Sequence, residues 1–203
     1  MKIAVLREGL TGLNFLWAAA QARRSVTEKY MNPQEFAQMW IKNDDVLEPF
    51  DISIVKTLFS DPLTKKFLSS GIPRDAAPFL SFGPHHDANL QSVSEQFNIE
   101  DAFDRYKIIG WNGYGDPIAV DEFDNSIVYL NHDDEFGYVF MSTTLEKLLQ
   151  ILLTVREFIE KVNTQPSQKY AELYELAISE LNSIDPKAIK EGPWGEELRS
   201  FIE

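Results

Sequence analysis

Residues 105–144 constrain the fold more than any other stretch of this chain. Four short runs rich in Ile, Val, Tyr and Phe suit the pleated surface of a β-sheet, and they cover residues 106–111, 117–120, 127–130 and 136–141. Turn-forming residues such as Asn112-Gly113 and Asp124-Asn125 separate the runs. Connections this short join antiparallel neighbours, because parallel strands need a long crossover. The stretch therefore predicts an antiparallel meander.

The residues after the meander predict a long amphipathic helix. Thr143, Thr144 and Glu146 have the pattern of a capping box. Apolar residues then recur at helical spacing, at Leu145, Leu148, Leu149, Leu152, Val155 and Ile159. A sheet followed by such a helix predicts that the helix covers one face of the sheet.

Shorter elements are predicted on both sides of this region. Helices are expected at 31–42, 53–59, 63–70 and 170–181, with a short helical turn after Asp185-Pro186. Residues 77–82 predict the first strand of the sheet, and the acidic segment 95–104 leads to the next one. Trp194 lies in a Gly-Pro break and is expected to fill a gap in the core. The predicted fold class is α+β, with a meander of about five strands packed by helices.

The N-terminal part is expected to be a helical segment of residues 1–45, followed by an α+β domain of residues 46–203. Residues 13–26 carry Leu13, Leu16, Trp17 and Ala20 at helical spacing. This apolar stripe either packs on the main domain or serves as a dimerisation or partner element. The apolar run 10–20 is too short to span a bilayer, and the N-terminus lacks a convincing signal peptide. We therefore expect a soluble, cytoplasmic protein.

Composition excludes several kinds of site. The 203 residues include no cysteine, which rules out disulfides, thiolate metal sites and a cysteine nucleophile. The formal net charge of −13 predicts repulsion from nucleic acid and from anionic membranes. Neither is therefore expected as a partner.

The three histidines form the most plausible catalytic alternative. His85, His86 and His132, with carboxylates beside them, could serve a metal-assisted hydrolase. Their spacing argues against this, because adjacent histidines on an extended loop point apart and no H-E-x-x-H pattern occurs. We predict no metal and no cofactor.

Nucleophilic and phosphate-binding motifs are also missing from the sequence. No G-x-S-x-G elbow is present. The glycines at 110, 113 and 115 lack the Lys-Ser/Thr of a phosphate loop, and they predict a tight turn between two strands instead.

The charge distribution points to a binding protein. No Lys or Arg occurs between Lys107 and Lys147, or between Arg74 and Arg105, although both intervals are rich in Asp and Glu. An acidic surface suits a basic protein partner, because complementary charge speeds association; the alternative is a solvated sheet edge. The candidate contact residues are the acidic Asp116, Asp121, Glu122, Asp124, Asp133, Asp134 and Glu135, with Trp111, Tyr114 and Phe123 as aromatic anchors.

Several motifs in order also resemble those of a known family. They are Phe67 to Pro73; Ile108, Ile109 and Gly110; Gly115, Asp116, Ile118, Val120 and Asp121; Ile127, Val128, Leu130 and His132; Ser142, Thr143 and Leu145; and Pro193, Trp194 and Leu198. Over about residues 50–200 the chain resembles the SUKH superfamily of SMI1/KNR4-like proteins, in its bacterial immunity-protein branch.

The resemblance implies an α+β domain that neutralises a bacterial toxin by binding it, without catalytic residues. The toxin would be a basic protein, for example a nuclease or a deaminase, whose cleft must attract nucleic acid. Eukaryotic relatives of the superfamily imply a third hypothesis, a regulatory scaffold in cell-wall signalling. Either a monomer or a homodimer would fit.

Overall fold

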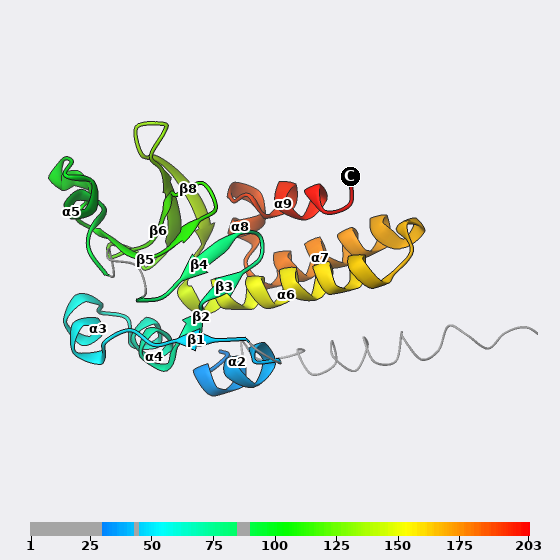
Figure 1. Cartoon of the computed structure of the whole chain (residues 1–203), viewed down its shortest axis with the longest axis horizontal. Helices are drawn as coiled ribbons and strands as arrows, with labels where there is room; N and C mark the ends of the chain where they lie inside the picture. The colour runs from blue at the N-terminus through cyan, green and yellow to red at the C-terminus, as the bar shows by residue number, and fades with distance from the viewer. Residues whose placement is uncertain (1–29, 43–44, 85–89) are drawn as a thin grey trace, which may run out of the picture. The chain divides into compact units, whose positions relative to one another are not determined.

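The computed structural model describes residues 30–42, 45–84 and 90–203 (Figure 1). The chain divides into two compact units, residues 1–31 and 32–203, and the following description concerns the second. The helix predicted at 13–26 and the residues His85 and His86 lie outside the described residues. The domain boundary after residue 45 stays a prediction.

The centre of the fold is a six-stranded antiparallel sheet whose strands follow the chain in order. This confirms the predicted meander and the α+β class. The strands are β3 (Asp75–Ala76), β4 (Leu80–Phe82), β5 (Tyr106–Asn112), β6 (Pro117–Asp121), β7 (Ile127–Asn131) and β8 (Gly137–Ser142). The last four match the predicted runs closely, because alternating side chains and turn formers are local signals.

The start of the sheet differs from the prediction of one strand over residues 77–82. These residues instead contain a turn followed by β4, and β3 pairs with β4 as a hairpin. Proline cannot donate to a strand ladder, so Pro78 favours a turn. The next residue, Phe79, has a left-handed backbone with φ of 55°, which also belongs in a turn. The sheet therefore has one strand more than expected.

One face of the sheet is covered by residues 93–103, which lie between β4 and β5. This segment forms α5 (Val93–Phe97) and the 3₁₀ turn η1 (Asp101–Phe103). The core beneath it contains Val93, Tyr106, Ile108, Ala119, Val128 and Leu130, with Phe97, Ile99 and Phe103 packed against it. A reciprocal capping box between Ser92 and Glu95 begins α5.

The long helix α6 (Leu145–Thr164) forms where it was predicted, but its cap and its packing differ. Its N-cap is Thr144, which accepts a hydrogen bond from the Lys147 backbone N–H at 3.2 Å. Lys147 therefore occupies the third helical position, and Glu146 cannot complete a capping box with Thr144. Of the strands, β8 makes the most extensive contact with α6, and much of the helix packs on α7 (Tyr170–Ile184), α4 (Pro62–Ser70) and α2 (Pro33–Trp40) (Figure 1).

Smaller elements complete the fold. They are the antiparallel pair β1 (Leu47–Glu48) and β2 (Ile72–Pro73), the helices α3 (Ile52–Leu58), α8 (Pro186–Glu191) and α9 (Trp194–Ser200), and the 3₁₀ turn η2 (Ser167–Lys169). The helix α9 was not predicted. Its first residue, Trp194, is fully buried, which confirms its expected place in the core. In the described part of the chain, no helix combines the length and apolarity needed to cross a bilayer.

Candidate functional site

The sheet topology divides the predicted contact residues between two opposite ends of the meander. Successive turns of a meander alternate between ends, so the β3–β4, β5–β6 and β7–β8 turns share one end. We call residues 77–79, 113–116 and 132–136 the three-turn rim. The opposite end, which we call the base, contains Arg105, Lys107 and residues 121–126. The five residues of β6 separate the ends by roughly 17 Å at about 3.4 Å per residue.

Carboxylates at the base are compensated by cations of the same chain. Asp121 is buried, and its Oδ2 lies 3.1 Å from Arg105 Nη2. Its Oδ1 accepts a hydrogen bond from the Phe123 backbone N–H at 2.9 Å. Glu122 Oε2 lies 3.7 Å from Lys107 Nζ. Asp121 therefore has a structural position, and Glu122 is partly neutralised.

The protonation equilibria at the base reflect these contacts. A hydrogen bond from Arg105 to the Tyr106 hydroxyl at 2.5 Å is the main cause that raises the pKa of Arg105, and the charge of Asp121 adds to it. Burial alone would raise the pKa of Asp124, but hydrogen bonds from Ser126 and the charges of Lys187 and Arg105 lower it overall. Both pKa shifts favour the charged forms of Arg105 and Asp124.

Asp116 joins two turns of the three-turn rim and is buried beneath them. Its Oδ1 accepts the His132 backbone N–H at 3.0 Å and lies 2.8 Å from the ring Nδ1 of His132. Its Oδ2 accepts the Asn112 side-chain amide at 2.8 Å. Asp116 is therefore positioned to hold the rim together and has little surface to offer a partner.

Replacing Asp116 by alanine is expected to lower the free energy of unfolding by about 2–3 kcal/mol. The His132 backbone N–H would lose its acceptor, which costs roughly 1–3 kcal/mol, whereas the half-buried His132 ring and Asn112 amide can turn to water. Urea unfolding of the two proteins measures the difference. Asp133→Ala is the control, since its exposed side chain should cost less than about 0.5 kcal/mol. Equal stability of Asp116→Ala and wild-type protein would contradict the assigned role.

The exposed side chains of the rim are two aromatic rings and three carboxylates. Tyr114 is 88% exposed and Phe79 is 83% exposed, and Asp133, Asp134 and Glu135 are exposed beside them. Trp111 is half-buried and packs against Phe97, with 6.1 Å between ring centroids. Phe79 was not among the predicted contact residues because residues 77–82 were assigned to a strand. The available signal was Pro78, which favours a turn at this point.

The negative charge of the rim is not compensated in the same way. Among residues 30–42, 45–84 and 90–203, no Lys or Arg forms an ion pair with Asp133, Asp134 or Glu135. Burial raises the pKa of Tyr129 in β7, and the charges of Asp116, Glu197 and Tyr114 raise it further. Burial, together with the charge of Glu196, raises the pKa of Glu197 itself. The rim is therefore the uncompensated acidic end of the sheet.

His132 serves the rim rather than a recognisable metal site. Its ring stacks on Phe97, with 6.3 Å between centroids, and its Nδ1 contacts Asp116. Within the part of the chain that the structure describes, no group of three or more His, Asp or Glu side chains is arranged to hold a metal ion. His85 and His86 lie outside that part.

Protein purified without added metal is expected to contain no stoichiometric zinc, iron or manganese, because its histidines lack ligand spacing. Elemental analysis of the purified protein measures this. Near-stoichiometric metal that disappears in a His132→Ala protein would contradict the prediction and favour the hydrolase alternative.

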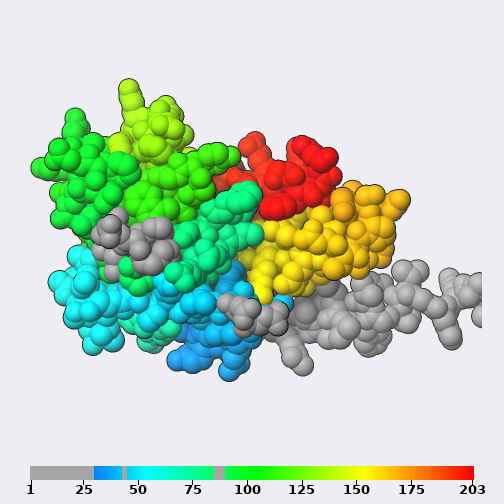
Figure 2. Space-filling view, viewed as in Figure 1, coloured from blue at the N-terminus to red at the C-terminus, as the bar shows by residue number. Residues whose placement is uncertain are grey.

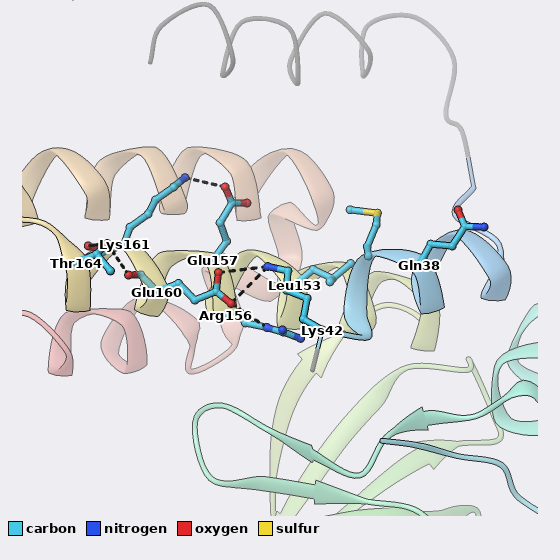
Figure 3. A pocket seen from close by; sticks show the side chains of 9 residues that line it. Gln38, Lys42, Leu153, Arg156, Glu157, Glu160, Lys161 and Thr164 are labelled. Carbon is cyan, nitrogen blue, oxygen red and sulfur yellow. Dashed lines mark hydrogen bonds and ion pairs between the residues drawn. The ribbon is translucent and has the colours of Figure 1, made fainter. Parts of the chain in front are cut away.

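A groove lies between α2 and α6, and charged residues that line it are paired (Figure 3). Glu160 lies 3.3 Å from Lys42 Nζ and 3.1 Å from Arg156 Nε, and Lys161 pairs with Glu157 at 2.8 Å. Burial opposes ionisation of Glu160, yet hydrogen bonds from Arg156 and Lys42 lower its pKa overall. Arg156 also donates to the Trp40 carbonyl at 2.6 Å, so these charges connect the two helices.

Comparison with known proteins identifies the family. The model of the SUKH-4 immunity protein family matches residues 44–200, which include the whole sheet and the helices that follow it. A comparison with curated proteins gave no significant match, and neither did a comparison with solved structures. The match covers more than half of the chain and includes the region of about residues 50–200 that resembles the SUKH superfamily. The chain therefore belongs to the SUKH-4 immunity protein family, within the SUKH superfamily.

Proposed function

We propose that this protein neutralises a bacterial toxin by binding it, without catalysing a reaction. Membership of the SUKH-4 immunity protein family is the observation that carries the proposal. The site geometry is consistent with it: the exposed side chains of the three-turn rim are aromatic rings and carboxylates, which suit contact with another protein. The side chains that could do chemistry, such as Asp116 and His132, are engaged with each other.

The charge of the chain indicates the kind of toxin. At a net charge of −13, the protein would attract a cationic partner and would be repelled by polyanions. A toxin that acts on nucleic acid, such as a nuclease or a deaminase, needs a basic cleft for its substrate. An acidic protein that occupies such a cleft would compete directly with the substrate. We therefore propose a basic toxin domain as the partner, met in the cytoplasm.

Affinity purification from the native host followed by a growth test examines this function. The expected result is a protein that co-purifies in a one-to-one complex, stops growth when expressed alone, and is harmless when co-expressed with this chain. Toxicity that persists during co-expression would contradict the proposal. A captured protein that is not toxic by itself would favour the regulatory-scaffold hypothesis instead.

A further inference from the structure

We propose that the three-turn rim is the surface that contacts the toxin, and that the toxin presents a basic cleft with apolar walls that receives Tyr114 and Phe79. This inference rests on the proposed function. It adds the end of the sheet that makes the contact, an aromatic residue outside the candidate set, and the chemistry that the partner must offer.

Charge compensation separates the two ends of the sheet. At the base, Asp121 pairs with Arg105 at 3.1 Å, and Glu122 is partly neutralised by Lys107 at 3.7 Å. On the rim, no Lys or Arg of the described residues pairs with Asp133, Asp134 or Glu135. Asp133 has one ion-pair contact, 3.5 Å from its Oδ1 to His132 Nε2, and that ring carries a positive charge only when it is protonated. The uncompensated charge therefore lies at the rim, where it would steer a cationic partner during diffusion.

The rim also offers the apolar anchors that an interface needs. Tyr114 and Phe79 are among the most exposed aromatic side chains of the described residues, and each can bury roughly 150–250 Å² on contact. Their turns touch, because a Cβ placed on Gly113 would lie only 2.9 Å from the Cβ of Phe79. Two rings beside uncompensated carboxylates are the combination expected of an interface centre and its polar border.

The rim is held in one conformation before any partner arrives. Asp116 ties the β5–β6 turn to the β7–β8 turn through His132 and Asn112. Phe97 of α5 supports both turns from below, with its ring centroid 6.1 Å from Trp111 and 4.9 Å from Phe136. A preorganised surface loses less conformational entropy on binding, so these supports favour tight association.

The shape of the rim selects a concave partner. The β7–β8 turn projects from the surface at the top of Figure 2, and the exposed rings stand on turns rather than inside a pocket. Projecting turns insert into a cleft, whereas carboxylates at their tips repel phosphate groups. The expected partner is therefore a protein with a basic cleft.

Two rim variants and two matched controls test the assignment against the toxic protein recovered by affinity purification. Asp133→Lys/Glu135→Lys reverses charge at the rim, and Glu172→Lys/Glu175→Lys makes the same change at exposed positions of α7. Tyr114→Ala removes a ring from the rim, and Phe123→Ala removes a ring that is 83% exposed at the base. Association and dissociation rate constants are measured at low and high salt, with melting curves to confirm folding.

The rim charge variant is expected to associate at least about tenfold more slowly than its α7 control, with a difference that shrinks as salt rises from roughly 0.1 M to 1 M. Tyr114→Ala should dissociate roughly tenfold faster than wild-type protein, whereas Phe123→Ala should be nearly unchanged. If the rim and control variants change the rate constants equally while wild-type protein still binds the toxin, the rim assignment is wrong and the proposed function stands. A toxic partner without a basic surface would also overturn it, and failure of wild-type protein to bind or protect would refute the function itself.

Discussion

Replacing Trp194 by alanine is expected to lower the free energy of unfolding by about 3–5 kcal/mol, the usual range for removing a fully buried tryptophan. The ring is 1% exposed, and its Nε1–H donates to the Met141 carbonyl of β8 at 2.7 Å. Alanine would leave a cavity and would remove this donor from the edge of the sheet. At roughly 2–4 °C per kcal/mol for a chain of this size, the melting temperature should fall by about 6–20 °C.

Trp194→Phe separates the two contributions to this effect. Phenylalanine retains most of the buried apolar surface but cannot donate a hydrogen bond to the Met141 carbonyl. The free energy of unfolding should therefore fall by about half as much as in Trp194→Ala, or less. A melting temperature of Trp194→Ala within about 2 °C of wild type would contradict the buried position, since it would correspond to less than roughly 1 kcal/mol.

Replacing Asp185 by alanine should be comparably damaging, because one buried carboxylate connects β8 to α8. Its Oδ2 accepts the Thr143 backbone N–H at 2.7 Å, the Thr143 hydroxyl at 2.9 Å and the Ser142 hydroxyl at 3.1 Å. Its Oδ1 caps α8 by accepting the Ala188 N–H at 3.3 Å. With at least two backbone donors left unsatisfied at about 1–3 kcal/mol each, the expected cost is on the order of 3 kcal/mol or more.

Asp185→Asn provides the control for this prediction. Its amide oxygen can replace Oδ2 and retain the bonds from Thr143, while its NH₂ group would face Ala188 and lose the helix cap. The expected cost is therefore about 1–2 kcal/mol, close to that of a lost N-cap. Denaturant unfolding should rank wild type above Asp185→Asn, and Asp185→Asn above Asp185→Ala. An alanine variant as stable as the asparagine variant would argue against the role of the carboxylate.

Elements with local signals could be predicted from the sequence, and contacts set by strand register could not. The runs that became β5 to β8 alternate with turn formers, and Asn32-Pro33 marks the start of α2 through a capping box. The hairpin of β3 and β4 was missed because strands of two and three residues carry almost no periodic signal.

The candidate site illustrates the same limit. Arg105 lies before the interval 108–146, which contains no Lys or Arg. Its contact with Asp121 could therefore not be predicted from their separation in the sequence. The register of β5 and β6 pairs Tyr106 with Asp121. This pairing brings the guanidinium of the preceding residue, Arg105, beside the Asp121 carboxylate. Asp116 likewise meets His132 only because their turns lie at one end of the sheet. The sequence therefore shows which residues are acidic, but exposed carboxylates cannot be separated from structural ones without the contacts of the fold.

Titration of the purified toxin with this protein tests the central claim most directly, namely that protection results from stoichiometric binding. A fixed amount of toxin, well above the dissociation constant of the complex, is incubated with increasing amounts of this protein, and residual toxin activity is measured. Activity should fall linearly and reach its minimum at one equivalent, and it should return when the complex is dissociated by denaturation and the toxin is refolded alone. Complete inactivation at a small fraction of one equivalent, or activity that persists at a large excess, would contradict the account.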